Sequence, residues 1–383
     1  MEFYDVIIAG AGPSGSTCAG LCSKSGLKTL LVDRDVFPRI KPCGGALSEF
    51  ALQGLDFELP TDLIERECFG ARVHYGDIVS NITENHRIAA FVSRERFDSF
   101  LLEKAKESGS DILLGKQVSE IKINRDFATV KAGDQFFKSL MVVGADGVNS
   151  TVSRYVRKPY GKEELLFTLY ERLYESKRGI EEKQGKIMDL FFGRIKFGYG
   201  WVFPHDEYYS LGIGGLYSSF KNPKTIYENF ARSAGFSPRN IKGYFLPLGG
   251  VKRPLAGERI ILAGDAAGFV DPLTGEGIAY AIHSGRTVSG IIQEAIKKNN
   301  YSKDYLFSSY LKRFKIRKNI ESSLRLARII HSYPDIFLKQ MISDGKALKK
   351  YFEIPRGNLT YGKYTTWLAG RLPMYFFKSL CQK

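Results

Sequence analysis

Three glycines near the N-terminus have the spacing of a phosphate-binding turn. Gly10, Gly12 and Gly15 form a Gly-x-Gly-x-x-Gly run. The first permits a tight turn, the second lets a diphosphate approach the backbone, and the third lets a helix lie close against a strand. Pro13 and Ser14 fall where that helix begins, and its free backbone N–H groups and dipole would favour an anion. These residue types predict that the turn binds a diphosphate.

An acid stands at the end of the next apolar run. Asp33 lies 18 positions after Gly15, where its carboxylate can accept hydrogen bonds from ribose hydroxyls, and Arg34 follows it. Val6–Ala9, directly before the glycines, is a short apolar run typical of a strand buried on both faces of a parallel sheet. The glycine run alone is weak evidence. The order strand, turn, helix, strand and acid predicts a dinucleotide site.

Two later segments repeat the pattern of a glycine and an acid after an apolar run. Asp146 follows Phe136–Val143, and Gly264 and Asp265 follow Arg259–Ala263. Asp265 could instead simply cap the turn that follows it. The recurrence at three strand ends predicts one nucleotide-binding domain assembled from separate pieces of the chain.

A glycine-rich turn at Asp271–Ile278 runs into a predicted long helix that ends near Ile296. Gly275 and Gly277 stand at the end of this turn. The free N–H groups and the positive dipole end of the helix would face whatever lies in front of them. The simpler interpretation is an ordinary helix N-terminus.

Three aromatic residues alternate along a predicted strand. Tyr199, Trp201 and Phe203 are two positions apart, so their side chains would share one face of that strand. Aromatic faces attract a nearby cation by about 1–2 kcal/mol per ring in a dry site. The same spacing fits three rings that only fill a core.

Cys43 is the thiol best placed for chemistry. It lies beside glycines near a predicted helix start, two residues from Lys41, so it could donate a proton or act as a redox-sensitive gate. A lone cysteine is more often a small core residue, as we expect for Cys18 and Cys22. The chain's five cysteines lack metal-ligand spacing, so we expect reduced thiols and no metal site.

The elements that position these residues predict a mixed α/β fold. Parallel-sheet strands alternate with helices at both ends of the first 300 residues, and aromatic and aliphatic residues alternate between them as in antiparallel strands. We expect a discontinuous Rossmann-like nucleotide-binding domain, an inserted antiparallel-sheet substrate domain, and a basic helical C-terminal region. Their predicted bounds are 1–60, 94–158 and 240–298 for the first, 61–93 and 159–239 for the second, and 299–383 for the third.

Three helix predictions depend on local signals. A helix is expected near Ala46–Leu52. Ser93 is a plausible cap of an amphipathic helix whose apolar face includes Phe97 and Leu101. Asp304–Ile330 carries apolar residues at helical spacing, which predicts one further amphipathic helix.

The three glycine and acid segments together resemble the FAD-binding signature of the flavoprotein hydroxylase-like superfamily. There the third segment places its acid, here Asp265, on the ribityl or diphosphate part of FAD, and Arg94, in an Arg-x-x-Phe-Asp setting, matches a position that contacts the cofactor. Lys41–Gly45 resembles the Lys-x-Cys-Gly-Gly loop of geranylgeranyl reductases, and Tyr199–Pro204 resembles the Tyr-x-Trp-x-Phe-Pro core of their aromatic motif. The proline that leads that motif is replaced here by Lys196.

The resemblance implies an FAD-dependent reductase that saturates C=C bonds of a geranylgeranyl-type isoprenoid chain in a lipid or quinone. Flavin N5 would supply a hydride to one carbon and a proton would reach the other. The turn into Ile278 would stabilise the negative charge of the reduced flavin at its N1/C2=O edge. The implied catalytic residues are Cys43, Tyr199 and Trp201, and Phe203 joins the two aromatics in binding substrate. The implied FAD-binding residues are Gly10, Gly12, Pro13, Ser14, Gly15, Asp33, Arg34, Cys43, Gly44, Arg94, Asp146, Gly264, Asp265, Gly275, Gly277 and Ile278.

Two other functions fit the same scaffold. One is an FAD-dependent aromatic monooxygenase or halogenase that consumes NADPH and oxygen. The other is a membrane-surface flavoprotein that only transfers electrons or binds lipid. The Cys43 loop and the aromatic strand favour the reductase over both.

Positive charge is concentrated in the last quarter of the chain. Lys297–Lys383 holds 19 Lys and Arg against 5 Asp and Glu, whereas the rest of the chain holds 37 and 36. The excess suggests an anionic membrane surface, a phosphorylated substrate or an acidic electron donor such as ferredoxin, and a solvated basic face is the simpler interpretation. Trp367–Ala369 and Met374–Phe377, interleaved with Arg371 and Lys378, fit either a membrane interface or a buried closing helix.

Composition and motifs bound the partners and location. A second Gly-x-Gly-x-x-Gly typical of a separate nicotinamide domain is missing, so a transiently bound NAD(P)H or ferredoxin is the expected electron donor. No nucleic-acid motif accompanies the charge, so no nucleic-acid partner is expected. The chain enters an apolar strand within its first residues and has no uncharged apolar stretch of about 18 residues. We expect a cytoplasmic protein, peripheral on the inner face of the membrane if it contacts one.

Overall fold

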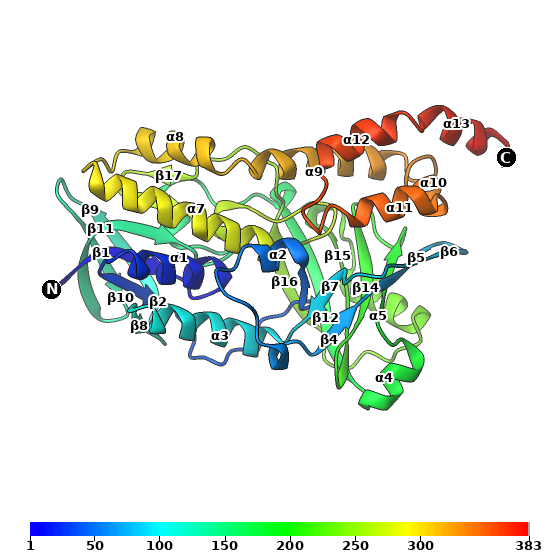
Figure 1. The fold of residues 1–383 in the computed structure, drawn as a ribbon, viewed down its shortest axis with the longest axis horizontal. Coiled ribbons are helices and arrows are strands. Elements are labelled where there is room, and N and C mark those ends of the chain that lie inside the picture. Colours follow the sequence, from blue (N-terminus) through cyan, green and yellow to red (C-terminus); the bar gives the residue numbers. More distant parts are fainter. Residues whose placement is uncertain (382–383) are drawn as a thin grey trace.

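The first of two large sheets contains the strands predicted for the nucleotide-binding domain. The computed structural model describes residues 1–381, without the side chains of 378–381. The sheet has the order β17-β18-β11-β1-β2-β8, with antiparallel β9 and β10 attached to β11 (Figure 1). The neighbours from β18 to β8 are parallel and their central strands are buried on both faces, as the apolar runs predict. Its strands are β1 (Glu2–Ala9), β2 (Thr29–Val32), β8 (Asp111–Leu113), β9 (Val118–Ile123), β10 (Ala128–Ala132), β11 (Gln135–Gly144), β17 (Ala256–Gly257) and β18 (Ile260–Leu262).

Three long helices pack beside this sheet. α1 (Pro13–Lys24) lies between α3 (Arg94–Glu107) and α7 (Ile278–Lys297) and contacts both (Figure 1). Ser93 occupies the N-cap position of α3, but its hydroxyl donates to the Glu95 carboxylate (Oγ to Oε2, 2.6 Å) and caps no backbone N–H group. The predicted cap is therefore wrong, because a charged acceptor two residues away binds the hydroxyl instead.

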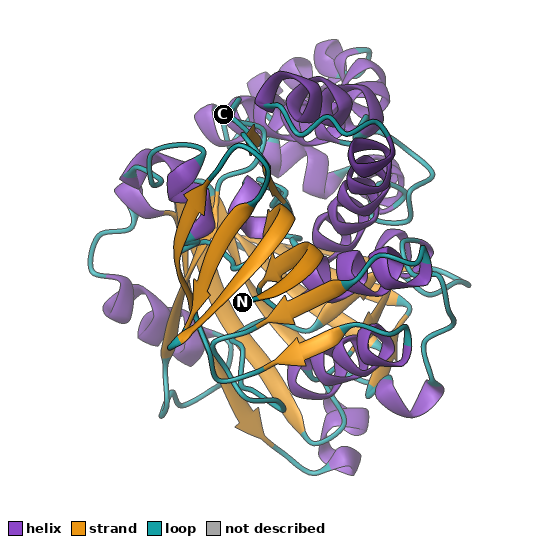
Figure 2. Ribbon diagram, turned by 90° about the vertical axis from the view of Figure 1, so that its left-hand side faces the viewer, coloured by secondary structure: helices purple, strands orange, loops and turns teal. Residues whose placement is uncertain are grey.

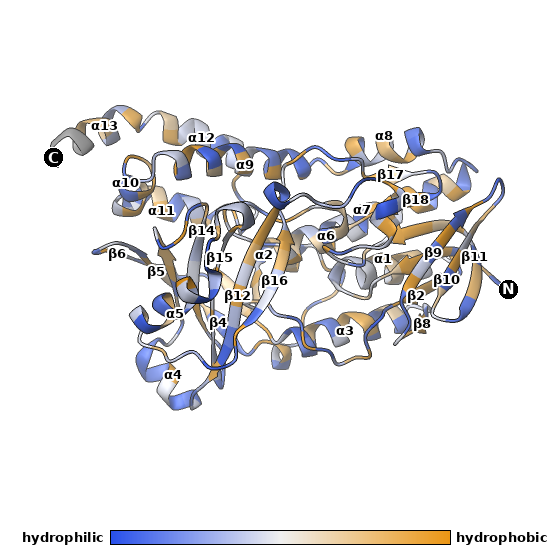
Figure 3. Ribbon diagram, turned by 180° about the vertical axis from the view of Figure 1, so that it is seen from behind, coloured by the Kyte–Doolittle hydropathy of each residue, from blue (hydrophilic) through white to orange (hydrophobic). Residues whose placement is uncertain are grey.

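The second sheet has seven strands in the order β16-β12-β15-β14-β13-β5-β6. The predicted antiparallel arrangement is confirmed for every pair but one, since β5 and β13 run parallel. α4 (Lys177–Lys183) and α5 (Pro223–Ser233) pack near β15, and α4 is mostly hydrophilic (Figure 3). The strands are β5 (Gly70–Tyr75), β6 (Ile78–Thr83), β12 (Leu165–Tyr174), β13 (Ile187–Phe192), β14 (Gly198–Pro204), β15 (Tyr208–Leu216) and β16 (Lys242–Pro247).

A small third sheet corrects one helix prediction. β3 (Ala46–Ser48) pairs with β7 (Ala89–Phe91), which also pairs with β4 (Arg66–Cys68). The predicted helix near Ala46–Leu52 is therefore wrong in its first half, and α2 (Glu49–Gln53) begins only after Ser48 accepts a hydrogen bond from the Ala51 N–H group (3.1 Å). The pairing partner is some 40 residues away in the sequence, so tertiary contact overrides the local helix signal.

The C-terminal helices lie along one side of the molecule and gather over both sheets when seen from the end (Figures 1 and 2). The predicted single helix over Asp304–Ile330 is wrong, because the chain breaks at Phe314. Phe314 is fully buried among the core residues of the first sheet, with its ring centroid 4.7 Å from that of Phe269. Further along, Leu326 packs with the second sheet. The helices are α8 (Lys303–Arg313), α9 (Arg317–Ser332), α10 (Leu338–Ser343), α11 (Gly345–Phe352), α12 (Tyr361–Ala369) and α13 (Leu372–Cys381).

The strand pairing departs from the predicted domain division at two places. β3, in the predicted piece 1–60, pairs with β7 of the predicted piece 61–93. β16 pairs with β12 in the second sheet, whereas the prediction placed it in the piece 240–298 of the nucleotide-binding domain. A long-range pair of this kind leaves no local signal in the sequence, and the remaining bounds stay a division that we propose. Within residues 1–381, no helix has the combined length and apolar character needed to cross a membrane.

Candidate active site

The glycine turn between β1 and α1 is tightly packed on one side and open on the other. A Cβ atom on Gly15 would lie 1.7 Å from the carbonyl oxygen of Gly10, and Gly10 itself has a φ of +99°. At Gly12, by contrast, the nearest atom to an added Cβ would be Arg39 Nη2, 3.7 Å away. No side chain caps α1 and its first turn holds no acid. The open space and the free N–H groups fit the diphosphate of a dinucleotide.

Asp33 closes the same turn. Its carboxylate is 8% exposed and accepts hydrogen bonds from the N–H groups of Ala11 (2.6 Å) and Asp35 (2.9 Å). A carboxylate offers about four acceptor sites, so two hydrogen bonds leave room for a ribose hydroxyl. Arg34 is exposed and lies away from the cavity described below.

The two later acids have different surroundings. Asp146 accepts hydrogen bonds from Ser150 and from the N–H groups of Thr151 (2.7 Å) and Val152 (3.2 Å), so it stabilises its own turn. Burial raises the pKa of Asp146 against the effect of these hydrogen bonds. Asp265 instead lines the cavity between the two large sheets. The residue before it is close to α1, since an added Cβ on Gly264 would lie 2.7 Å from Ser14 Oγ.

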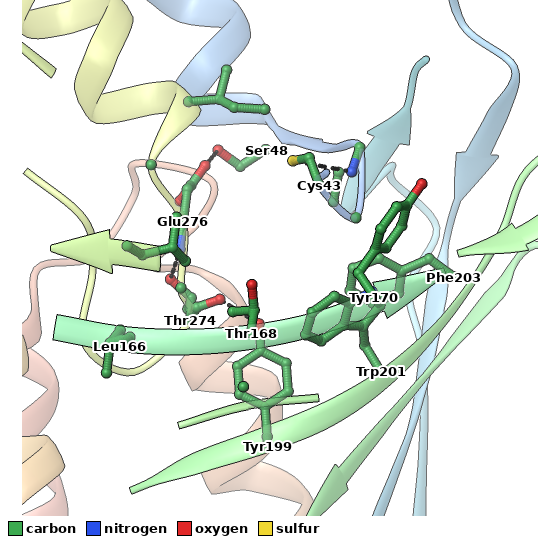
Figure 4. A pocket seen from close by; sticks show the side chains of 18 of the residues that line it. Cys43, Ser48, Leu166, Thr168, Tyr170, Tyr199, Trp201, Phe203, Thr274 and Glu276 are labelled. Carbon is green, nitrogen blue, oxygen red and sulfur yellow. Dashed lines mark hydrogen bonds between the residues drawn. The ribbon is translucent and has the colours of Figure 1, made fainter. Parts of the chain in front are cut away.

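A predominantly apolar cavity lies between the first sheet, the second sheet and α11. Figure 4 shows Cys43 and Ser48 on one side of it and the aromatic side chains of β14 across from them. Of the predicted site residues, those that line the cavity are Pro13, Cys43, Gly44, Arg94, Tyr199, Trp201, Phe203, Asp265, Gly275, Gly277 and Ile278, and those that do not are Gly10, Gly12, Ser14, Gly15, Asp33, Arg34, Asp146 and Gly264.

The aromatic side chains of β14 form a continuous wall of this cavity. The ring centroids of Tyr199 and Trp201 are 6.1 Å apart, and those of Trp201 and Phe203 are also 6.1 Å apart. Two hydrogen bonds fix the wall, from Trp201 Nε1 to Ser210 Oγ (3.2 Å) and from the Tyr199 hydroxyl to the carbonyl of Thr274. Burial raises the pKa of Tyr199, and nearby acids add to the shift, so it remains a neutral phenol. All three rings line the cavity, and Trp201 and Phe203 also belong to the core beside the second sheet.

A buried histidine fixes the loop that carries Cys43. His205 Nε2 lies 3.0 Å from the carbonyl oxygen of Gly44, and its Nδ1 lies 2.5 Å from a carboxylate oxygen of Glu65. The imidazole thus links the Gly44 carbonyl to the Glu65 carboxyl group. Tyr208 stacks on the imidazole at a centroid distance of 4.3 Å and also donates to Glu65 (3.0 Å). These contacts hold the loop at a fixed distance from the β14 wall.

Arg94 forms a buried charge cluster beside the thiol. Its guanidinium donates to both carboxylate oxygens of Asp98 (2.8 and 2.7 Å), and Arg39 Nη2 is 3.1 Å from the same carboxylate. Burial disfavours the charged guanidinium, but Asp98 and the neighbouring Cys43 outweigh it and raise the pKa of Arg94. Arg94 thus faces both the cavity and its buried partner.

Several cavity residues escaped the sequence prediction. Thr168 and Tyr170 come from β12, Ser48 from β3, and Tyr351 from α11. Tyr351 gave no usable signal, because its contact depends on how the C-terminal helices pack. Glu276 did give a signal in the sequence, since it is an acid between the two glycines of the predicted turn. Burial raises the pKa of Glu276 to about 7, a hydrogen bond from Ser48 opposes the shift, and the charge of Asp271 adds to it.

Comparison with known proteins identifies the family. A family model for an FAD binding domain matches residues 3–177. The chain is 30% identical to a geranylgeranyl diphosphate reductase of Rhodobacter capsulatus over 97% of its own length and 98% of that protein's. The chain belongs to the geranylgeranyl reductase family. It is an FAD-dependent reductase of that family, so the predicted family, cofactor and enzyme class are confirmed.

Other members of the family and its fold agree. A digeranylgeranylglycerophospholipid reductase of Thermoplasma acidophilum is 30% identical, over 79% of this chain and 81% of that protein. The crystal structure of a geranylgeranyl bacteriochlorophyll reductase-like protein from Thermoplasma acidophilum superposes with a TM-score of 0.80 at 23% identity, covering 97% of this chain and 99% of that one. This superposition confirms the predicted mixed α/β fold.

Proposed function

We propose that this reductase saturates C=C bonds in the isoprenoid chain of a lipid or quinone. The observation that carries the proposal is the apolar cavity between the FAD-binding sheet and the aromatic wall of β14. Its lining suits a prenyl chain and offers little to a polar substrate. The relatives' names refer to geranylgeranyl diphosphate and to digeranylgeranylglycerophospholipid, which supports the same substrate class here.

The protein's part in binding the cofactor follows from its two open helix starts. We assign the diphosphate to the turn at Gly10–Gly15 and the ribose to Asp33, with Gly264 and Asp265 nearby. α7 has no side-chain cap and no acid in its first turn, so its N–H groups at Gly277 and Ile278 can stabilise negative charge on the ring edge that faces them. When bound there, reduced FAD supplies the hydride from N5.

The aromatic wall would favour the charge that develops in the substrate. If protonation leads, positive charge grows on a substituted alkene carbon, and the faces of Tyr199, Trp201 and Phe203 can stabilise it by about 1–2 kcal/mol per ring in a dry site. The predominantly apolar lining disfavours water, which would otherwise trap the cation. Tyr199 is held by Thr274, so its ring stays on the wall.

A direct assay tests the proposed function. Purified protein should bind FAD, and after reduction by dithionite it should convert a geranylgeranyl lipid to products heavier by two hydrogens per bond, detected by mass spectrometry. Flavin reoxidation should require the lipid under anaerobic conditions. Oxygen-dependent hydroxylation or halogenation would instead support the monooxygenase or halogenase alternative. Lipid binding without turnover would support the electron-transfer or lipid-binding alternative.

We expect Cys43→Ala to keep FAD bound and to slow alkene reduction by prereduced enzyme about 10-fold, equivalent to about 1.4 kcal/mol of transition-state stabilisation. The reason is that its thiol lines the cavity beside Arg94. Cys68→Ala is the matched control, because Cys68 is equally small but lies outside the cavity. Single-turnover absorbance of the flavin measures the rate, and an unchanged rate in Cys43→Ala would remove this thiol from the chemistry.

We also propose that the basic C-terminal region contacts an anionic partner, either lipid headgroups or an acidic ferredoxin, with NAD(P)H as the other donor. Leu368 and Tyr375 are buried, as a closing helix requires, while Phe376 and Phe377 are 47% and 69% exposed, as a membrane interface requires. Each of these two predicted roles therefore fits part of the segment. The membrane-interface prediction for Lys378 and the reduced thiol expected of the fifth cysteine, Cys381, concern side chains outside the described part of the structure.

Phe377→Ser should weaken binding to vesicles that contain anionic lipid, because it removes an exposed apolar side chain next to the basic region. Wild-type binding should fall as salt rises, since surface charge is screened. Co-sedimentation with anionic and zwitterionic vesicles measures both effects. Equal binding at low and high salt would contradict contact through charge.

A further inference from the structure

A second cavity meets the first at the turn before α7. Its volume is about 380 Å³, and Thr274 and Glu276 line both cavities. The second cavity reaches the surface at Lys315 and Lys318, whose side chains are exposed. The other contributors come from the α8–α9 junction and the segment before and into α12, and include Asn319, Ser322 and Thr360. Apolar side chains make up most of the lining of both cavities, and the second also has polar side chains at its opening to the surface.

Glu276 lies in the wall between the two cavities. Its carboxylate accepts a hydrogen bond from Ser48 on the substrate side (Figure 4), while its own N–H group donates to Thr274 Oγ1 (3.2 Å). The neighbouring acid Asp271 is already engaged, accepting from Ser323 (2.7 Å) and from three further donors. Glu276 is therefore the carboxyl in this wall that is free to exchange a proton.

Its electrostatic surroundings keep both protonation states accessible. Burial raises the pKa of Glu276 to about 7, and only Ser48 opposes the shift. A group with a pKa near the working pH can both give up and regain a proton in each cycle. The titratable groups that act on it are Asp271 on its own turn, Tyr280 on α7 and Tyr199 on β14. The other titratable and charged groups that line the two cavities around it are Lys41, Cys43, Arg94, Asp265 and Tyr351 in the first and Lys315, Lys318 and Tyr361 in the second.

We propose that Glu276 delivers the proton that completes alkene saturation and recovers it from water in the second cavity. This inference rests on the proposed function. One alkene carbon forms its new C–H bond with the hydride that reduced FAD supplies, and the other forms its bond with the proton that leaves the Glu276 carboxyl. The π electron pair of the alkene enters that second bond. Water in the second cavity, in exchange with bulk solvent, then returns a proton to the carboxylate, and the hydroxide left behind is neutralised in the solvent. Cys43 lines only the first cavity, so it has no direct contact with water in the second.

The central test is Glu276→Gln, which keeps the shape of the side chain and removes its proton. We expect the variant to bind FAD normally and to reduce the alkene about 100-fold or more slowly in single turnover, the usual contribution of a general acid. Wild-type rates should fall as the pH rises through about 7, because Glu276 must be protonated to donate. Glu103→Gln, on the exposed face of α3, is the control and should match wild type.

A readout independent of turnover comes from the carboxyl itself. The infrared carbonyl band of a protonated carboxylic acid should be present at neutral pH in the wild-type protein, titrate near pH 7 and be missing from Glu276→Gln. Ser48→Ala is the milder second variant. Because Ser48 lowers the pKa of Glu276, its loss should move both the band and the rate profile to higher pH.

The outcomes separate the inference from the proposed function. An alkene-reducing wild type together with a Glu276→Gln variant of similar rate, within about threefold, would overturn the role of Glu276 alone. A band that does not change in Glu276→Gln, or a pH profile that Ser48→Ala does not move, would do the same. A wild-type protein that reduces no isoprenoid alkene would overturn the proposed function itself.

Discussion

Gly15→Ala is expected to yield protein that is purified without FAD. The added Cβ would lie 1.7 Å from the carbonyl oxygen of Gly10 and 3.3 Å from the Cβ of Ala145, so α1 must move away from the turn. Overpacking of this kind costs up to about 3 kcal/mol, which corresponds to about 100-fold weaker binding if the cost falls on the bound state. Visible absorbance of the purified protein and titration with FAD measure the loss.

Two other glycines separate this packing effect from cofactor contact. Gly20→Ala, in the same helix, places its Cβ 3.5 Å from the nearest atoms and should gain slightly in stability through helix propensity. Gly12→Ala meets only Arg39 at 3.7 Å, so thermal unfolding of the FAD-free protein should be unchanged while FAD affinity falls. If Gly12→Ala binds FAD as tightly as wild type, the diphosphate does not occupy the space in front of α1.

The parts of the site that the sequence predicts are those with short-range signals. The turn at Gly10–Gly15 is recognisable because the positive φ of Gly10 and the close contact of Gly15 with the Gly10 carbonyl both fall within six residues. Tyr199, Trp201 and Phe203 are recognisable as one face because side chains on a strand alternate, and Cys43 because of its glycine neighbours. Whether that face lined a pocket or a core depended on what lies opposite.

The remaining parts depend on contacts between distant segments. β3 forms because β7 pairs with it, and the helix breaks at Phe314, whose side chain is fully buried in the core of the first sheet. Tyr351 reaches the cavity only through the packing of α11. Glu276 stands inside a predicted turn, yet its raised pKa comes from burial and from the charge of Asp271, against the hydrogen bond from Ser48, and local sequence does not reveal these surroundings. Local sequence patterns thus predict the residues proposed to bind FAD better than the residue proposed to supply the proton.

Replacing Arg94 is expected to cause the largest loss of stability. Asp98 is fully buried, and Arg94 supplies both of its shortest ion-pair contacts while Arg39 supplies a third. Arg94→Leu leaves the buried Asp98 carboxylate with Arg39 as its remaining ion-pair partner. Removing one partner of a buried pair costs about 3–5 kcal/mol in the free energy of unfolding. Urea denaturation measures the free energy of unfolding. Arg178→Leu is the control, because its helical pair with Glu182 is exposed and should contribute less than about 1 kcal/mol.

The pH dependence gives an independent check on this cluster. Burial opposes the charge of Asp98, but Arg94 and Arg39 outweigh it and lower its pKa below the ordinary value. A carboxyl with a lowered folded-state pKa contributes stability that is present above the unfolded-state pKa of about 3.9 and is lost as the pH falls through the folded value. Wild-type protein should therefore lose this contribution below about pH 4, and Asp98→Asn should not.

The double variant Arg94→Leu/Asp98→Leu should recover part of the stability lost in Arg94→Leu, because no uncompensated charge remains buried. If the double variant is instead less stable than Arg94→Leu, packing rather than charge holds this end of α3.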